Sequence, residues 1–239
     1  MRPTLALVPK RLLIITDDSG ESLEIYYAQQ RFLEAGWRPV IAATRRKLLH
    51  GVIHDFEPDW NTYVERPGYR IPSEITFKQA KAADYDAVLC IGGRAPEFLR
   101  HEAAVIRLLR DFDRQGKWIY SICHGIQLLI AAGLVRGRTL TCYRNVRLEL
   151  EQAGGKWVDR HCARDGRLIE YPPESSPAQS PSAESSPAES SPMSQPPTAD
   201  IARASVRQWG QFAGEEEALA AHFQTSCRVI DRRPPTLFE

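Results

Sequence analysis

The stretch KWIYSICHGIQLLIAAG, residues 117–133, changes its hydrophobic period halfway along and decides the fold. Its first part, up to Ile122, is a short apolar run of β-prone residues, which is typical of a buried strand. From Gly125 onward the apolar residues recur at helical spacing, and Gly133 provides a helix stop. The pattern therefore predicts a strand that turns sharply into a helix, with Cys123 and His124 at the turn.

Cys123 occupies the position that such a turn pushes out of the sheet, which is the geometry of a nucleophile elbow. The free N–H groups and the dipole at a helix N-terminus favour a thiolate over a thiol. Gly125 fits this interpretation, because a side chain there would crowd the turn. A buried structural cysteine is the alternative, since free cysteines are often buried. This motif by itself leaves both interpretations open.

Composition argues against several classes of protein. The 239 residues include 31 Lys and Arg against 30 Asp and Glu, with no basic patch, so we expect no nucleic-acid partner. No window approaches the length of a membrane span, and the N-terminal apolar segment is too short for a signal peptide. Five widely spaced cysteines without a C-x-x-C motif argue against a disulfide framework and a zinc site. We expect a cytoplasmic protein that uses no metal or cofactor and has no membrane partner.

The segments around this stretch predict an α/β fold: a doubly wound, mostly parallel sheet with helices on both faces, as in flavodoxin-like proteins. Strands are predicted at 11–16, 38–43 and 86–91, and helices at 22–35 and 105–112. A strand-helix-strand unit at 139–143, 146–153 and 156–160 precedes a closing hairpin at 161–171 that turns at Asp165 and Gly166. Residues 45–75 have no clear periodicity and are predicted to form an ordered excursion over the surface.

The composition changes abruptly at Pro172. Residues 172–199 contain 8 prolines and 9 serines, too few apolar side chains to offset the entropy lost on ordering. We therefore expect an α/β domain at 1–171, a disordered Ser/Pro-rich linker at 172–199 and a C-terminal segment at 200–239 that can form one helix. Either this segment or another subunit would cover the apolar sheet face left without a final helix, and an apolar stripe with Val206 and Trp209 favours weak folding of the segment back onto the sheet.

Three predicted strands end beside residues that could take part in catalysis. Glu21 follows the first strand, Gly92 and Gly93 follow the strand at 86–91, and Cys123 follows the central strand. The carboxyl ends of parallel strands meet at one edge of a doubly wound sheet. A thiolate there can attack a carbonyl group while backbone N–H groups receive the oxyanion and a carboxylate moves a proton.

Taken together, these residues resemble the PfpI family of the ThiJ/PfpI superfamily, which has the class I glutamine amidotransferase-like fold. The matching motifs are Ser-Ile-Cys-His-Gly at 121–125, Gly-Gly-Arg-Ala-Pro-Glu at 92–97 and the pair Glu21 and Glu24 after the first strand. The resemblance runs from about residue 11 to residue 169. It departs from the family pattern where the Ser/Pro repeat displaces the usual final helix, and where the excursion at 45–75 is longer than usual.

The resemblance implies a role for each matching residue. Cys123 would be the nucleophile with His124 as its partner, and Glu21 would contact the thiol as the acid/base. The backbone N–H groups of Gly93 and His124 would form the oxyanion hole. Glu97 would reach a histidine of a neighbouring subunit, which implies a homo-oligomer. The remaining pocket residues would be Glu24, Arg94 and Tyr143, although a solvated position for Glu24 and a diverging His124 are alternatives.

Three functions are compatible with these residues. The first is a cysteine-nucleophile enzyme acting on small carbonyl compounds or their protein adducts, like a cofactor-free glyoxalase or deglycase. The second is an intracellular cysteine peptidase with a Cys-His-Glu site completed across subunits. The third is a redox sensor without turnover, in which an accessible Cys123 is oxidised to a sulfenic or sulfinic acid.

Overall fold

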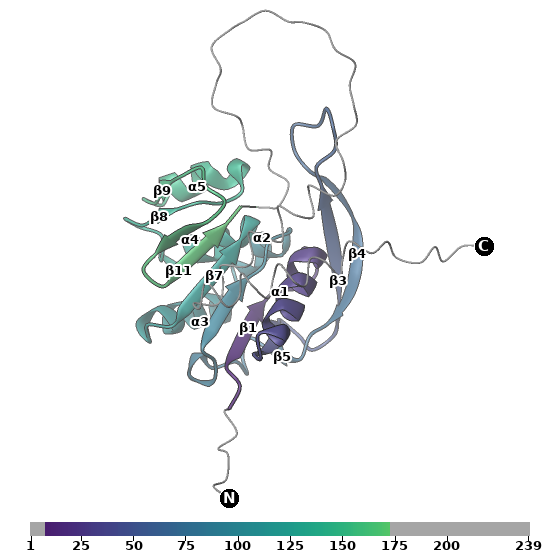
Figure 1. Ribbon diagram of the computed structural model, residues 1–239, viewed down its shortest axis with the longest axis vertical. Helices are drawn as coiled ribbons and strands as arrows, with labels where there is room; N and C mark the ends of the chain where they lie inside the picture. The colour runs from purple at the N-terminus through teal and green to yellow at the C-terminus, as the bar shows by residue number, and fades with distance from the viewer. Residues whose placement is uncertain (1–7, 173–239) are drawn as a thin grey trace, which may run out of the picture. The chain divides into compact units, whose positions relative to one another are not determined.

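The computed structural model describes residues 8–172, and its main sheet has seven strands in the order β10-β11-β7-β6-β1-β2-β5 (Figure 1). The linker and the C-terminal helix expected beyond residue 172 lie outside the described residues, so the proposed domain boundaries stay predictions. The strands are β1 (Arg11–Ile15), β2 (Arg38–Ala43), β3 (Leu48–Asp55), β4 (Val64–Pro72), β5 (Ile75–Thr76), β6 (Ala87–Cys90), β7 (Trp118–Ile122), β8 (Thr139–Leu140), β9 (Lys156–Trp157), β10 (Ala163–Asp165) and β11 (Leu168–Tyr171).

The α-helices of the described part lie between these strands. They are α1 (Ser22–Glu34), α2 (Ala95–Leu99), α3 (Ala103–Arg114), α4 (Ile126–Ala132) and α5 (Arg147–Gln152), with short 3₁₀ helices η1 (Ala82–Asp84), η2 (Cys123–Gly125) and η3 (Arg144–Val146). The strands and helices predicted at 11–43 and 86–122 agree with these bounds to within about two residues, the usual uncertainty at helix ends. The short helix α2 was not predicted.

The central strands pair in parallel because both of their faces are covered. Strand β1 pairs with β2 and β6, and β7 pairs with β6 and β11, all in parallel. Every residue of β6 is buried, as expected for a nearly continuous apolar run. Within the seven-stranded sheet of residues 8–172, only β10 runs antiparallel, paired with β11 across the predicted turn at Gly166, whose φ is 63°.

Helices cover both faces of the sheet, as the doubly wound prediction requires. Phe32 of α1 packs against Tyr120 of β7 with ring centroids 6.1 Å apart. The turn into α4 lies on the opposite face, because a Cβ built at Gly125 would meet the hydroxyl oxygen of Ser121 at 2.7 Å. Neighbouring residues of a strand point to opposite faces, so α1 and α4 sandwich β7 between them.

The excursion predicted at 45–75 is mostly regular structure. Strands β3 and β4 form an antiparallel hairpin with a register shift between His50 and Val52, and Figure 1 shows it beside α1. Its polar residues and prolines obscure the two-residue alternation, which is why the sequence did not reveal it. Gly51 allows close packing here, since a Cβ on it would lie 2.3 Å from the hydroxyl oxygen of Ser22.

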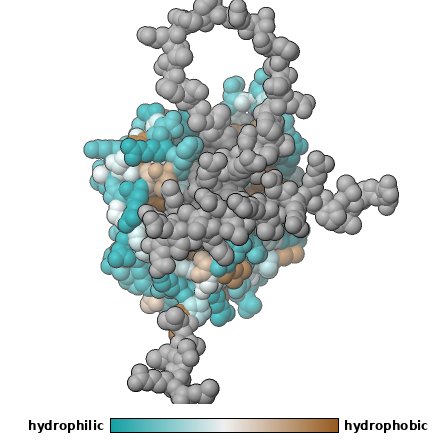
Figure 2. All heavy atoms as spheres, viewed as in Figure 1, coloured by the Kyte–Doolittle hydropathy of each residue, from teal (hydrophilic) through white to brown (hydrophobic). Residues whose placement is uncertain are grey.

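The visible surface of the described part is largely hydrophilic (Figure 2). Large apolar side chains that remain exposed include Trp60, Tyr69 and Leu148. Isolated residues of this kind are normal on soluble domains. None of the helices within residues 8–172 has the length and apolar character needed to cross a bilayer.

Candidate active site

Cys123 lies on the predicted elbow. Strand β7 ends at Ile122, Cys123 adopts a left-handed φ of 58°, and α4 begins at Ile126 and ends at Gly133 with φ 74°. A cysteine in this region of backbone space is strained and persists only where its surroundings impose it. The turn needs Gly125, because a Cβ there would lie 2.4 Å from the carbonyl oxygen of Cys90.

Glu24, rather than Glu21, is the carboxylate with the larger influence on Cys123. The Oε2 atom of Glu24 accepts a hydrogen bond of 2.7 Å from the N–H of Gly92. A Cβ built on that glycine would be 2.7 Å from Cβ of Cys123 and 2.8 Å from Oε2 of Glu24, so the absence of a side chain at Gly92 leaves room for both side chains. Glu24 is buried, which corrects the solvated alternative.

Glu21 instead caps the first helix. It is the N-cap residue of α1, and its Oε2 accepts a hydrogen bond of 2.6 Å from the N–H of Glu24. An N-cap carboxylate stabilises the helix and here also fixes the backbone that presents Glu24. Among the carboxylates that raise the pKa of Cys123, Glu24 has a larger influence than Glu21. The acid/base role expected of Glu21 therefore fits Glu24 better.

Two backbone N–H groups point at the sulfur of Cys123. They belong to Gly93 and His124, the two residues predicted to form the oxyanion hole, and both lower the pKa of the thiol. Gly93 has φ 73°, and a Cβ on it would lie 2.4 Å from the carbonyl oxygen of Ser19, so only glycine fits this turn. An oxygen formed beside the sulfur would meet donors that are already in place.

Burial dominates the ionisation of Cys123. The side chain is buried, and desolvation followed by the charge of Glu24 raises the pKa of the thiol well above its ordinary value, against the two N–H donors. The low thiol pKa expected at a helix N-terminus is therefore not found in this arrangement. Any reaction of Cys123 as a thiolate would therefore require a group that accepts the thiol proton, and Glu24 is a nearby carboxylate.

His124 turns back toward the sulfur. Its Nδ1 lies 3.2 Å from Sγ of Cys123, so the two neighbours on the elbow do not diverge. Burial, and then proximity to His54, lower the pKa of His124 to about 4. The imidazole is therefore neutral at neutral pH.

His124 is surrounded by an aromatic wall, which the sequence did not identify. Its members come from the hairpin and from the loop after β8, and their ring centroids lie 5.1–6.2 Å from that of His124: His54, Tyr63 and Tyr143. Phe56 packs against Tyr63 and Tyr143. Of this wall only Tyr143 was predicted, and the others could have been found only by recognising that 48–72 is a hairpin folded over the site.

Polar contacts fix the phenol group of Tyr143 in this wall. The hydroxyl of Tyr143 lies 3.0 Å from Oγ1 of Thr62 and accepts a hydrogen bond of 2.8 Å from Nδ2 of Asn145. Burial raises the pKa of Tyr63 to about 12 and also raises the pKa of Tyr143. Both phenols therefore keep their protons at neutral pH and can donate hydrogen bonds.

Arg94 and Glu97 lie at the outer rim. Arg94 donates two hydrogen bonds to Glu65, of 2.6 and 2.8 Å, and its pKa is raised by this contact. Glu97 is exposed on α2 and has an electrostatic influence on His54 and Tyr63. Its proposed contact with a second subunit stays a prediction. Within residues 8–172, no three His, Cys, Asp or Glu side chains group in a way suited to a metal ion.

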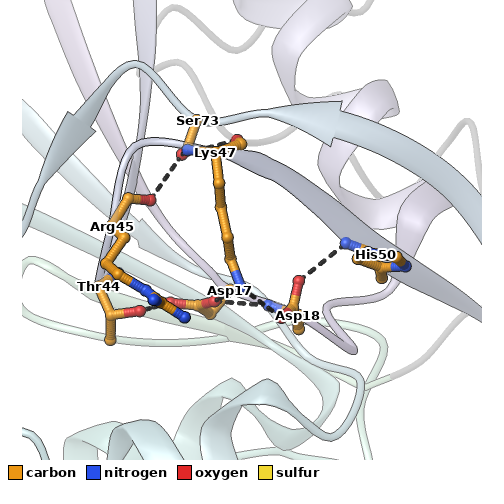
Figure 3. A network of polar contacts seen from close by, with 7 residues as sticks. All are labelled: Asp17, Asp18, Thr44, Arg45, Lys47, His50 and Ser73. Carbon is orange, nitrogen blue, oxygen red and sulfur yellow. Dashed lines mark hydrogen bonds and ion pairs between the residues drawn. The ribbon is translucent and has the colours of Figure 1, made fainter.

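A polar network ties the loop that carries Glu21 to the base of the hairpin (Figure 3). The buried Asp17 accepts hydrogen bonds from the backbone N–H and the hydroxyl of Thr44 at 2.7 and 2.6 Å. Asp18 accepts one from the N–H of His50 at 2.9 Å and pairs with Lys47. These contacts fix the end of β1 relative to β2 and β3, and thereby fix the first-loop carboxylates.

A sequence model of the DJ-1/PfpI family matches residues 10–170 of this chain. The chain belongs to the DJ-1/PfpI family. This confirms the resemblance inferred from the elbow and the two glutamate-containing motifs.

Curated DJ-1/PfpI relatives align with the same part of the chain. Protein/nucleic acid deglycase 2 of Escherichia coli is 36% identical over 172 residues, which are 71% of this chain and 92% of that protein. Deglycase PfpI of Pyrococcus furiosus is 30% identical over 159 residues, 66% of this chain and 87% of the relative. Protein DJ-1 homolog D of Arabidopsis thaliana is 35% identical over 168 residues, 67% of this chain and only 43% of the plant protein.

Solved structures of DJ-1/PfpI proteins have the same fold. A two-domain protein with DJ-1/ThiJ/PfpI-like and ferritin-like domains from Anabaena variabilis matches with a TM-score of 0.62 at 25% identity, covering 69% of this chain and 44% of that one. Drosophila melanogaster DJ-1beta matches with a TM-score of 0.59 at 23% identity, over 70% and 83% of the two chains, and supports the fold alone.

Proposed function

We propose that this DJ-1/PfpI enzyme uses Cys123 to attack small carbonyl compounds, or their adducts with proteins. The observation that carries the proposal is the set of groups around the Cys123 thiol: the N–H groups of Gly93 and His124 interact with the sulfur, and Glu24, which is hydrogen-bonded to Gly92, is the carboxylate with the largest effect on the pKa of the thiol. Relatives that are named deglycases, at 30–36% identity, support the same class of chemistry.

The first step follows from this geometry. Glu24 takes the thiol proton as Sγ of Cys123 bonds to the aldehyde carbon of a 2-oxoaldehyde. The electron pair of the carbonyl bond moves to oxygen, where the N–H groups of Gly93 and His124 stabilise it. Return of the proton to that oxygen gives a hemithioacetal. The raised pKa of Cys123 fits a thiol that is deprotonated only as it attacks.

The second step is an internal redox change that needs no external oxidant. The hydrogen on the former aldehyde carbon leaves as a proton, and the neighbouring ketone carbon receives a proton. The hydroxyl group on the first carbon loses its proton, and the former ketone oxygen gains one. The first carbon is thereby oxidised to a thioester and the second reduced to a secondary alcohol. Water hydrolyses the thioester, releasing a 2-hydroxy acid and the Cys123 thiol. The net reaction converts one 2-oxoaldehyde and one water into one 2-hydroxy acid.

The test is the consumption of methylglyoxal, and the formation of lactate, by the purified protein without glutathione. We expect turnover by the wild type and none by Cys123→Ser. Glu24→Gln should lower kcat about 10²-fold or more, since it removes the proton acceptor. Glu21→Gln is the matched control: it should cost about 1 kcal/mol of stability as a weakened cap and change kcat little. Equal slow consumption by wild type and Cys123→Ser would refute the proposal.

A peptidase is the second candidate, and one contact favours it. The 3.2 Å approach of His124 Nδ1 to the Cys123 sulfur is that of a nucleophile and its base. This candidate requires Glu97 of a neighbouring subunit as the third member, so it predicts an oligomer. Peptide cleavage that survives in Glu97→Gln, or in a monomeric preparation, would exclude it. The redox-sensor alternative has less support, because a buried thiol with a raised pKa is not readily oxidised.

A further inference from the structure

His54 is a second imidazole at this site, and the chemistry described so far does not use it. It lies near the end of β3, with its ring stacked on Tyr63 at a centroid distance of 3.8 Å and edge-on to His124 at 6.2 Å. His124 in turn contacts the Cys123 sulfur. The ring of His54 therefore belongs to the aromatic wall around His124, the residue that contacts the sulfur.

Glu65 holds one nitrogen of this imidazole. The Nε2 atom of His54 lies 3.1 Å from Oε2 of Glu65, and the same oxygen accepts the 2.6 Å hydrogen bond from Nε of Arg94. The Arg94 guanidinium lowers the pKa of Glu65, so the carboxylate is ionised. An ionised carboxylate accepts only, which places the proton of neutral His54 on Nε2 and leaves Nδ1 with a lone pair.

The second nitrogen of His54 has no described partner. The His54 side chain is only 4% exposed, and no residue among 8–172 hydrogen-bonds to its buried Nδ1. Burial, more than any nearby charge, lowers the pKa of His54, so Nδ1 is an unprotonated acceptor at neutral pH. A buried acceptor without a donor costs free energy, and such atoms in native proteins usually have a function.

The hairpin is fastened to the catalytic loops, so this imidazole is held in place. The N–H of Val52 donates to the carbonyl oxygen of Gly20 at 3.0 Å, and the N–H of Arg94 donates to the carbonyl oxygen of Ser19 at 2.8 Å. Arg94 directly follows the oxyanion-hole residue Gly93, and its ion pair with Glu65 ties that loop to β4. His54, Glu65 and the oxyanion hole thus form one connected unit.

We propose that His54 is a further catalytic residue, whose Nδ1 accepts the hydroxyl proton of the hemithioacetal as that carbon becomes the thioester carbonyl. The inference rests on the proposed function. As the proton moves to Nδ1, the O–H electron pair becomes the second bond of the C=O group. The imidazolium that forms is stabilised by Glu65, as a carboxylate stabilises the histidine of a catalytic triad. His54 then passes this proton to the oxygen of the former ketone, which becomes the hydroxyl of the secondary alcohol, so the conversion of hemithioacetal to thioester releases no net proton.

The decisive variant is His54→Gln. Its amide nitrogen can still donate to Glu65 as Nε2–H does, but glutamine has no basic nitrogen to replace Nδ1. His50→Gln is the matched control, because His50 is exposed on the same strand and only its backbone N–H joins the network of Figure 3. Turnover of methylglyoxal is measured for both, with mass spectrometry of the hemithioacetal on Cys123.

We expect His54→Gln to lower kcat about 10²-fold with little change in KM, and the Cys123 adduct to accumulate, because attack is intact while the later proton transfer is slow. His50→Gln should behave as wild type. Wild-type kinetics in a folded His54→Gln variant, with no accumulation, would overturn the inference.

A second measurement separates this inference from the proposed function and needs no variant of His54. In ¹⁵N spectra of the imidazole groups, His54 should show a protonated Nε2 and a bare Nδ1. Addition of methylglyoxal should shift the Nδ1 resonance in wild type and leave it unchanged in Cys123→Ser. If wild type binds methylglyoxal covalently but makes no lactate, the proposed turnover fails, while a shift still supports His54 as the acceptor. If the Nδ1 resonance of His54 stays unchanged in a protein whose Cys123 carries the adduct, the inference about His54 is wrong.

Discussion

Replacing Glu170 with glutamine probes a carboxyl group that is fully buried beneath the elbow. Glu170 lies on β11, has no exposed surface and is in register with Ser121 of β7. Cys90 of β6 is in register with the same serine, so the three residues form one row across the sheet. Neither carboxyl oxygen has a hydrogen-bond partner within residues 8–172 by distance and angle, although the Ser121 hydroxyl is close enough to influence the group.

Burial raises the pKa of Glu170 well above its ordinary value, and the opposing effect of Ser121 is smaller. A group whose pKa is higher in the folded state contributes stability below its unfolded pKa, about 4.3, and loses that contribution as pH rises through the folded pKa. Each pH unit in this window lowers the free energy of unfolding by about 1.4 kcal/mol. If the buried carboxyl stays protonated, the loss between pH 5 and pH 7 is about 2.7 kcal/mol.

Glu170→Gln removes the ionisation and nearly keeps the shape. The buried amide has its own unsatisfied groups, at a cost that does not vary with pH. The expected result is therefore a change of slope: relative to wild type, the variant gains up to about 2.7 kcal/mol on going from pH 5 to pH 7.

The assay is urea unfolding of the full chain at pH 5, 6 and 7, followed by circular dichroism. Glu151→Gln is the control, because Glu151 forms a surface pair with Arg147 and should change stability by less than about 1 kcal/mol at any pH. Parallel pH dependence in wild type and Glu170→Gln would show that Glu170 does not gain a proton on folding, and the reasoning would fail.

Three further changes test other parts of the site. Gly92→Ala should reduce methylglyoxal turnover at least 10²-fold and slow alkylation of the thiol, because its Cβ would lie 2.7 Å from that of Cys123 and 2.8 Å from Oε2 of Glu24; unchanged rates would contradict the site geometry. His124, whose pKa burial lowers to about 4, should contribute stability above pH 6.5 that is lost on acidification toward pH 4, about 3.4 kcal/mol in urea unfolding, and His124→Gln should flatten this loss. Asp17→Ala should lower the free energy of unfolding by about 3 kcal/mol, because it leaves three hydrogen-bond donors without their acceptor. A loss below about 1 kcal/mol would show that water replaces the carboxylate.

Local patterns in the sequence determined the core of the fold and the position of Cys123 on the elbow. A buried strand followed at once by a helix-period run predicted the elbow at Cys123, because a change of period within a few residues leaves room only for a sharp turn. The change of period acts between near neighbours in the chain, so the sequence alone expresses it. The glycines at 93 and 125 mark places where a Cβ would meet backbone oxygen atoms, and Gly92 marks one where it would meet the side chains of Cys123 and Glu24. The sequence shows these glycines, but only the tertiary structure identifies the distant residues that they approach.

The tertiary structure decided which side chains reach the sulfur. Glu21 and Glu24 are one helical turn apart, and only the packing of α1 against Gly92 determines that the second faces the thiol while the first caps the helix. The raised pKa of Cys123 likewise depends on burial beneath elements distant in sequence, which overcomes the local effect of the helix N-terminus. The β3–β4 hairpin, whose sequence has no clear hydrophobic period, folds over the site and brings to it His54, Tyr63 and Glu65. Long-range packing, which leaves no mark on local periodicity, thus set the electrostatics and the aromatic wall of the site.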